Sequence, residues 1–202
     1  MTAAIDFYFD FSSPYAYFAA RRIEQLAAAH GRTVNWHPVL VAALTQSTGT
    51  PLAVTVPVKW HYVNLDMQRV AAADNIPFQL PPGFPKLMLE PGRAMLWIRE
   101  THGADKAAKF ARTCFQVYFG DGIDLADADV VAGIGASLGI DRAALLEGMA
   151  SSAIKQQFKQ GGAVAVEQGV FGVPFVIADD EPFWGYDRLA LLERKLASAV
   201  LR

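Results

Sequence analysis

The residues with the clearest chemical potential stand where a short strand meets a helix near the start of the chain. Residues 5–9 are mostly apolar and aromatic, which predicts a buried β-strand. Two serines and Pro14 follow, and residues 16–29 are good helix formers that predict a helix ending at Gly31. Ser13, at this junction, either caps the helix or joins its free amides in stabilising a phosphate, carboxylate or thiolate.

Two further candidates lie near the end of the chain. Pro174 interrupts the strand-like residues 173–177, where a proline has no amide proton for a central ladder. By itself it fits an ordinary trans proline on an edge strand. Asp187 and Arg188 begin the last predicted helix, residues 186–200, where an acid is favourable as a cap or a first-turn residue.

The remaining pattern predicts the elements that must position these residues. Residues 1–40 form a β-α-β unit with parallel strands and a right-handed crossover. The other segments, in chain order, are a strand at 33–40, a loop at 41–57, a helix at 58–73, a proline-dense wall or crossover at 76–85, helices at 92–102, 105–119, 127–138, 141–149 and 151–167, and strands at 173–177 and 182–184. Lys59, Tyr62, Asp66 and Arg69 share one face of the 58–73 helix, with an exposed Asp66–Arg69 ion pair as the simplest interpretation.

Composition limits the function classes. The chain has 202 residues, 52% of them hydrophobic, and a net charge of −2, which gives no reason to expect nucleic acid or a membrane surface as partner. Neither a signal sequence nor a membrane-spanning run is present, so a cytoplasmic location is the default expectation. The one cysteine, Cys114, excludes a dithiol cycle within the chain and reads as a buried core thiol. The sequence contains no cluster with the spacing of metal ligands.

Four stretches together resemble one known family. They are Ser13-Pro14, Lys59-x-x-Tyr62-x-x-x-Asp66, Gly172-Val173-Pro174 and Gly185-Tyr186-Asp187-Arg188. In this order and spacing they resemble the 2-hydroxychromene-2-carboxylate isomerases and kappa-class glutathione transferases. The resemblance implies an α/β, thioredoxin-like domain of the DsbA type, with a large all-helical insertion. Residues 1–57 and 169–202 would form the thioredoxin-like domain, and residues 58–168 the helical insertion.

The resemblance also implies roles for individual residues. Glutathione would lie along a cis Val173–Pro174 bond with its sulfur over Ser13, whose hydroxyl and neighbouring amides would stabilise the thiolate. Asp187 and Arg188 would hold the γ-glutamyl end, and Lys59 would supply a cation for carboxylates. The family commonly has an Asn after the second strand, where this chain offers Thr50 instead. The partners implied are glutathione, a small aromatic or electrophilic substrate, and a second copy of the chain in a homodimer.

Three functions remain open at this level. The leading one is a glutathione-dependent isomerase of aromatic-compound catabolism that converts 2-hydroxychromene-2-carboxylate to trans-o-hydroxybenzylidenepyruvate. A kappa-type transferase would use the same residues to join glutathione permanently to an electrophile. A redox-inactive module would instead bind extended peptides at Pro174 by strand addition, without any need for glutathione. Ser13-Pro14-Tyr15-Ala16 resembles a Cys-Pro-x-Cys redox motif in which both cysteines are replaced. A dithiol oxidoreductase is therefore excluded unless a partner supplies the cysteines.

Overall fold

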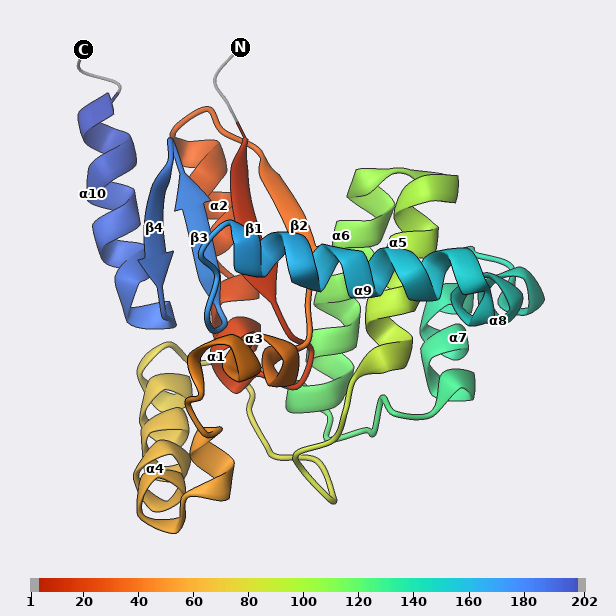
Figure 1. The fold of residues 1–202 in the computed structure, drawn as a ribbon, viewed down its shortest axis with the longest axis horizontal. Helices are drawn as coiled ribbons and strands as arrows, with labels where there is room; N and C mark the ends of the chain where they lie inside the picture. The colour runs from red at the N-terminus through yellow and green to blue at the C-terminus, as the bar shows by residue number, and fades with distance from the viewer. Residues whose placement is uncertain (1–3, 200–202) are drawn as a thin grey trace.

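A four-stranded mixed sheet with the order β2-β1-β3-β4 organises the computed structural model, which describes residues 4–199 (Figure 1). The strands are β1 (Ile5–Phe9), β2 (Val34–Pro38), β3 (Phe175–Ala178) and β4 (Glu181–Trp184). Strand β1 runs parallel to β2 and antiparallel to β3, and β3 and β4 form a hairpin. The β-α-β and β-β-α order predicted from the sequence is therefore confirmed.

Helices lie on both faces of this sheet and beyond both of its edges. In Figure 1, α9 crosses the front of the sheet, α2 lies behind it, α10 lies beyond β4, and α5 to α8 gather on the β2 side. The helices are α1 (Pro14–Ala20), α2 (Ile23–Ala29), α3 (Val41–Thr48), α4 (Pro57–Ala73), α5 (Leu89–His102), α6 (Ala104–Phe115), α7 (Ala128–Ser137), α8 (Arg142–Ala150), α9 (Ser152–Glu167) and α10 (Leu189–Ala199). Short turns η1 (Ala53–Thr55), η2 (Gln116–Gly120) and η3 (Tyr186–Arg188) complete the fold. No helix within residues 4–199 is long and apolar enough to cross a membrane.

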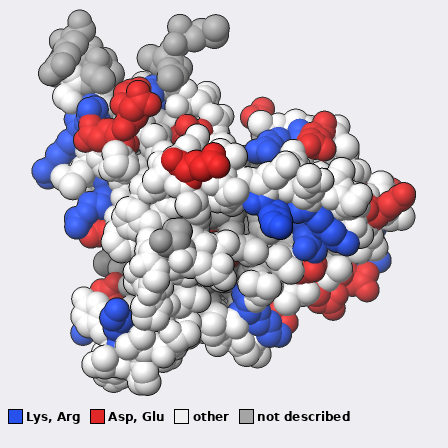
Figure 2. All heavy atoms as spheres, viewed as in Figure 1, with Lys and Arg blue, Asp and Glu red and all other residues white. Residues whose placement is uncertain are grey.

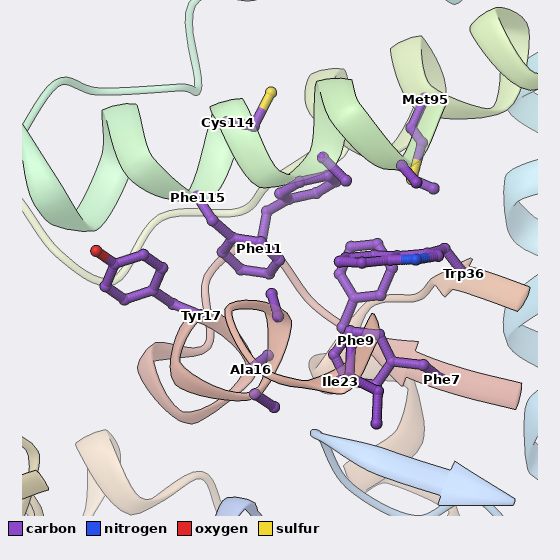
Figure 3. Close-up of a cluster of buried hydrophobic side chains, with 14 of the residues drawn as sticks. Phe7, Phe9, Phe11, Ala16, Tyr17, Ile23, Trp36, Met95, Cys114 and Phe115 are labelled. Atoms are coloured by element: carbon purple, nitrogen blue, oxygen red, sulfur yellow. The ribbon is translucent and has the colours of Figure 1, made fainter. Parts of the chain in front are cut away.

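The main core is an aromatic cluster between the sheet and the helices behind it. Phe7 and Phe9 alternate along β1 and meet the Trp36 ring of β2 edge-on, with ring centroids 5.1 and 5.4 Å apart. Phe11 and Phe115 extend the cluster toward α6, as Figure 3 shows. Because several of these side chains have essentially no exposed surface, their burial fixes the direction in which β1 delivers the chain to Ser13.

Cys114 occupies the core position expected for it. Its side chain extends from α6 and is fully buried (Figure 3). Burial raises the pKa of the thiol well above its ordinary value, so the reactive thiolate form is disfavoured.

Two predictions about the first sixty residues were wrong. The helix predicted over residues 16–29 is divided into α1 and α2, because the amide of Arg22 bonds to the carbonyl of Ala19 and ends the first ladder early. The predicted loop at 41–57 begins with helix α3, whose first amide, that of Val41, donates to the buried carboxylate of Asp10 at 2.7 Å. A distant acid thus caps a helix that local sequence does not signal.

The final helix also begins later than predicted. Residues 186–188 form the turn η3, so Asp187 precedes α10 rather than capping it directly, and α10 begins at Leu189. Leu189, Leu192 and Leu196 recur at helical spacing along α10 and are buried. Val200, the last residue of the predicted helix, lies outside the described residues.

Candidate active site

The turn after β1 is held by one buried acid. Asp10 is 3% exposed, and its carboxylate accepts hydrogen bonds from the amides of Ser12, at 2.8 Å, and Val41. Its carbonyl accepts from the amide of Ser13 at 2.9 Å. Burial raises the pKa of Asp10, and the two amides oppose that rise. This acid therefore ties the Ser13 turn to the start of α3.

Ser13 is the N-cap of α1, as one of the two sequence interpretations predicted. Its Oγ accepts a hydrogen bond from the amide of Ala16 at 3.2 Å, and Pro14 is the first helical residue. A hydroxyl that accepts through a lone pair retains its own proton for donation. No acceptor for that proton occurs among the described residues. Ser13 is thus available as a donor to an anion beside the turn.

The Val173–Pro174 bond is cis, as the resemblance implied. Tyr8 of β1 lies opposite Phe175 of β3, so the antiparallel pairing brings Pro174 to the end of β1 from which the Ser13 turn emerges. The Pro174 carbonyl accepts from the amide of Gly185 at 2.9 Å. Within residues 4–199, the amide and carbonyl of Val173 have no hydrogen-bond partner, which leaves a short open edge for an extended ligand.

A pocket of about 530 Å³ opens in front of this edge. We call it the cis-proline pocket. It is lined by residues from α1, α4, β4, η3 and the segments beside them, namely Tyr15, Tyr62, Asp66, Val70, Val173, Pro174, Trp184, Gly185, Tyr186, Asp187 and Arg188. Its volume lies in the range of small-molecule sites.

Tyr15 forms a polar contact between α1 and α4 at this pocket. Its hydroxyl donates to Asp66 Oδ2 at 2.5 Å. Burial raises the pKa of Tyr15, and the bond to Asp66 raises it further, so Tyr15 remains a protonated donor at neutral pH. This contact takes the place of the Asp66–Arg69 pair considered from the sequence, and it leaves the second oxygen of Asp66 available to the pocket.

A second polar cluster fixes the turn that carries Asp187 and Arg188. The Tyr186 hydroxyl donates to the carboxylate of Asp74, at the end of α4, and accepts from Arg22 Nη1 at 3.2 Å. Asp187 and Arg188 form an exposed ion pair of 3.2 Å. The turn is therefore anchored through Tyr186, while its two charged neighbours face the pocket.

The structure brings together some of the predicted site residues. Val173, Pro174, Asp187 and Arg188 line the cis-proline pocket. Ser13 is not among the lining residues, but it caps the helix whose second residue, Tyr15, is one of them. Lys59 lies exposed in the first turns of α4, and Thr50 lies exposed after α3; neither lines the pocket. Their roles stay predictions.

Sequence reasoning did not assign site roles to several lining residues. Tyr62 and Asp66 could have been predicted as site residues, because they share one helical face with Lys59. Tyr15 was visible only as the residue after Pro14. Nothing in the sequence indicated a site role for Trp184, because an aromatic residue at a strand end is ordinarily a packing residue. It is 55% exposed and contacts Phe171 edge-on, with ring centroids 4.8 Å apart.

Comparison with known proteins agrees with this architecture. The DsbA-like thioredoxin domain family matches residues 4–197. A 2-hydroxychromene-2-carboxylate isomerase of Sphingobium xenophagum is 33% identical over 97% of this chain and 99% of its own length. The solved structure of a 2-hydroxychromene-2-carboxylate isomerase superposes with a TM-score of 0.89 at 29% identity, covering 98% of this chain and 96% of that one.

A more distant relative is the kappa 2 glutathione S-transferase of Caenorhabditis elegans, which is 24% identical over 92% of this chain and 88% of its own length. The names of these relatives describe enzymes of two kinds. With its matching domain, full-length similarity and cis-proline pocket, the chain belongs to the DsbA-like thioredoxin-domain family, in the group that comprises 2-hydroxychromene-2-carboxylate isomerases and kappa-class glutathione transferases.

Proposed function

We propose that this protein is a glutathione-dependent isomerase of the 2-hydroxychromene-2-carboxylate isomerase type. The observation that carries the proposal is the unsatisfied polar edge beside the cis-proline pocket. There, the Ser13 hydroxyl has a proton to donate, and the Val173 amide and carbonyl have no partners within residues 4–199. An extended thiol-bearing peptide has the complementary groups, and two sets of named relatives point to this chemistry.

The pocket residues suit the parts of glutathione. Val173 would pair with the cysteinyl backbone by strand addition, as an edge strand pairs with a peptide. Asp187 and Asp66 offer carboxylates for the γ-glutamyl ammonium group, and Arg188 offers a guanidinium for its carboxylate. We assign to Lys59 and Thr50 only supporting contacts at the exposed end of the ligand, since neither lines the pocket.

Ser13 would act as a donor and not as a nucleophile. When bound, glutathione supplies a thiolate that adds reversibly to an electron-poor carbon and so permits rotation about a former double bond. The Ser13 hydroxyl would donate to the sulfur and lower its pKa, because a hydrogen bond to the charged form favours that form. Trp184 and Tyr62 line the same pocket and give it aromatic surface against which a small aromatic substrate can pack. We further propose a cytoplasmic homodimer, with the thioredoxin-like and helical units divided at residues 57/58 and 168/169.

Titration of reduced glutathione into the protein tests this proposal. We expect saturable heat together with an increase in thiolate ultraviolet absorbance, and we expect Ser13→Ala to lose the absorbance signal while retaining much of the binding. Ser12→Ala is the control, because the Ser12 side chain bonds to the Asp10 carboxylate, and the Ser12 amide bond to that carboxylate remains in the variant. Absence of binding at millimolar glutathione would make the peptide-binding module the better interpretation.

The competing enzyme activity is distinguished by the product. A kappa-type transferase is the second candidate, and its support is the similarity to the transferase of Caenorhabditis elegans. With an electrophilic aromatic substrate and glutathione, an isomerase returns a product of unchanged mass and regenerates glutathione. A transferase yields a product heavier by the mass of glutathione, which mass spectrometry of the reaction mixture detects directly.

A further inference from the structure

A second cavity lies at the opposite edge of the sheet from β4. It has a volume of about 340 Å³ and follows the outer side of β2, between α2 and the start of α6. We call it the β2-edge cavity. Its wall is largely apolar and includes Ala28, Val34, Trp36, Met95 and Ala108. This volume falls within the range of small-ligand sites, and the aromatic wall suits a planar ring.

Polar groups of β2 face this cavity without partners in the sheet. The amide of Ile5 bonds to the carbonyl of Thr33, and the amide of Val39 bonds to the carbonyl of Phe9. In a parallel pair, alternate residues of a strand bond to the neighbouring strand. In this register Asn35 and His37 of β2 bond toward β1, so the backbone N–H and C=O groups of Val34 and Trp36 point away from β1 and toward the cavity. The indole N–H of Trp36 is also buried without an acceptor in the described part of the chain.

Arg99 provides a charge at one end of the cavity. This partly buried arginine, in the last turn of α5, lines both the β2-edge cavity and a smaller cavity of about 180 Å³ beside α9. Its guanidinium forms no ion pair or hydrogen bond with any side chain of residues 4–199. The C-terminal end of a helix carries a partial negative charge that stabilises a cation. The position of Arg99 in the last turn of α5 is therefore favourable even without a paired carboxylate.

The other charges around the cavity are mostly paired. Arg32 binds Asp179 at 2.7 Å, and Glu24 binds Arg112. His37 lies 2.8 Å from Asp6. Asp105, exposed in the first turn of α6, also lines the cavity and forms no ion pair within residues 4–199. Figure 2 shows Lys and Arg side chains, with Asp and Glu side chains nearby, in the region that α9 crosses in Figure 1, and no residue of α9 lines the β2-edge cavity. Of the two arginines that line the cavity, Arg32 is paired and Arg99 forms no ion pair within the described residues, so Arg99 is the group available to an anion.

From these features we infer a second ligand site, in which a small aromatic carboxylate binds the β2-edge cavity. The ring lies against Trp36, Met95 and the lining alanines Ala28 and Ala108. The carboxylate accepts hydrogen bonds from the guanidinium of Arg99. A planar guanidinium pairs with a carboxylate through two parallel hydrogen bonds, so this group selects carboxylates over neutral ligands. The site is separate from the cis-proline pocket and requires no glutathione.

Calorimetric titration of 2-naphthoate into the whole protein, without glutathione, tests the inference. Saturable binding is expected, with 2-naphthamide, the neutral analogue, binding at least about tenfold more weakly. Arg99→Gln should weaken the binding of 2-naphthoate by a similar factor and leave the affinity for 2-naphthamide unchanged. Arg194→Gln is the charge-matched control, because Arg194 lies on α10 at the far edge of the sheet.

A blocking variant distinguishes this cavity from other apolar surfaces. Ala28→Phe places a ring at an exposed lining position of α2, whereas Ala29→Phe adds the same ring at an exposed neighbour that does not line the cavity. Loss of binding in the first variant alone supports the site. Equal binding in Ala28→Phe and Ala29→Phe, no effect of Arg99→Gln, or no saturable binding at millimolar 2-naphthoate each overturns it. Thermal melting of every variant confirms that the chain is folded.

Discussion

The Tyr15 hydroxyl donates to Asp66 Oδ2 at 2.5 Å and so joins the helix that follows Ser13 to the long helix α4. The two residues are 51 positions apart in sequence. Apolar packing of α4 comes from the buried Met67 and Ala71, with Trp60, Val63 and Val70 partly buried against the core. The Tyr15–Asp66 bond adds a polar contact on the pocket face of α4.

Tyr15→Phe should therefore loosen α4. We expect the free energy of unfolding to fall by about 1–2 kcal/mol, the usual consequence of removing a hydrogen bond to a charged group. Amides of α4 should exchange faster with deuterium, and glutathione should bind more weakly. Tyr62→Phe is the matched control, because the Tyr62 hydroxyl is exposed and has no partner among the described residues. Equal losses of unfolding free energy and glutathione affinity in the two variants would show that the Tyr15–Asp66 bond has no special role.

Asp10→Asn should disrupt the beginning of α3. An asparagine offers one acceptor oxygen and an NH₂ group where the carboxylate accepts from both Ser12 and Val41, so one amide loses its partner. We expect a loss of about 1–3 kcal/mol in unfolding free energy, with the fastest new hydrogen exchange in α3. Chemical denaturation and exchange measured by NMR provide the test. If α3 keeps its protection, the cap does not come from Asp10.

Gly185→Ala should impair the pocket more than its effect on stability explains. Gly185 has φ +110°, and a Cβ there would lie 2.6 Å from Asp187 Oδ1. The new methyl group must displace that carboxylate, so KM for glutathione should rise together with a loss of stability of about 1 kcal/mol or more. Gly139→Ala is the control, because it has φ +76° but open space around it. A Gly139→Ala protein with the same KM change would show that stability alone is responsible.

The Arg32–Asp179 pair should contribute a component of acid sensitivity. The hydrogen bond from Arg32 holds the pKa of Asp179 below its ordinary value. A lowered folded-state pKa stabilises the protein above the unfolded value of about 4, and this stability is lost as the pH falls through the folded-state value. Asp179→Asn should be less stable than wild type at neutral pH, by no more than about 1 kcal/mol because Asp179 is partly exposed, and the difference should vanish in acid.

The control for that measurement is Asp180→Asn. Asp179 and Asp180 both have positive φ, of 51° and 63°, in the turn between β3 and β4, and asparagine tolerates this conformation. Asp180 forms no ion pair within the described residues. Denaturation midpoints measured across the acid range should therefore separate the two variants. Parallel pH profiles for both would contradict the assignment to the Arg32 pair.

Local sequence predicted the elements that depend on short-range rules. The β1 strand, the capping role of Ser13, the helices of the middle of the chain and the hairpin near the end all follow from apolar period, caps and turn residues. The buried state of Cys114 follows from its apolar neighbours. These features need only information carried within about ten residues of chain.

The tertiary structure decided what depends on contacts between distant segments. The first amide of helix α3 bonds to the Asp10 carboxylate, 31 residues earlier, and the turn carrying Asp187 is anchored by Tyr186 to Asp74, 112 residues earlier. The sequence also determined that Arg99 is charged. Only the packing of α5 and α6 beside β2 decided that Arg99 lines a cavity with no ion pair among residues 4–199. Side-chain partners across elements are set by the relative placement of those elements and not by spacing along the chain.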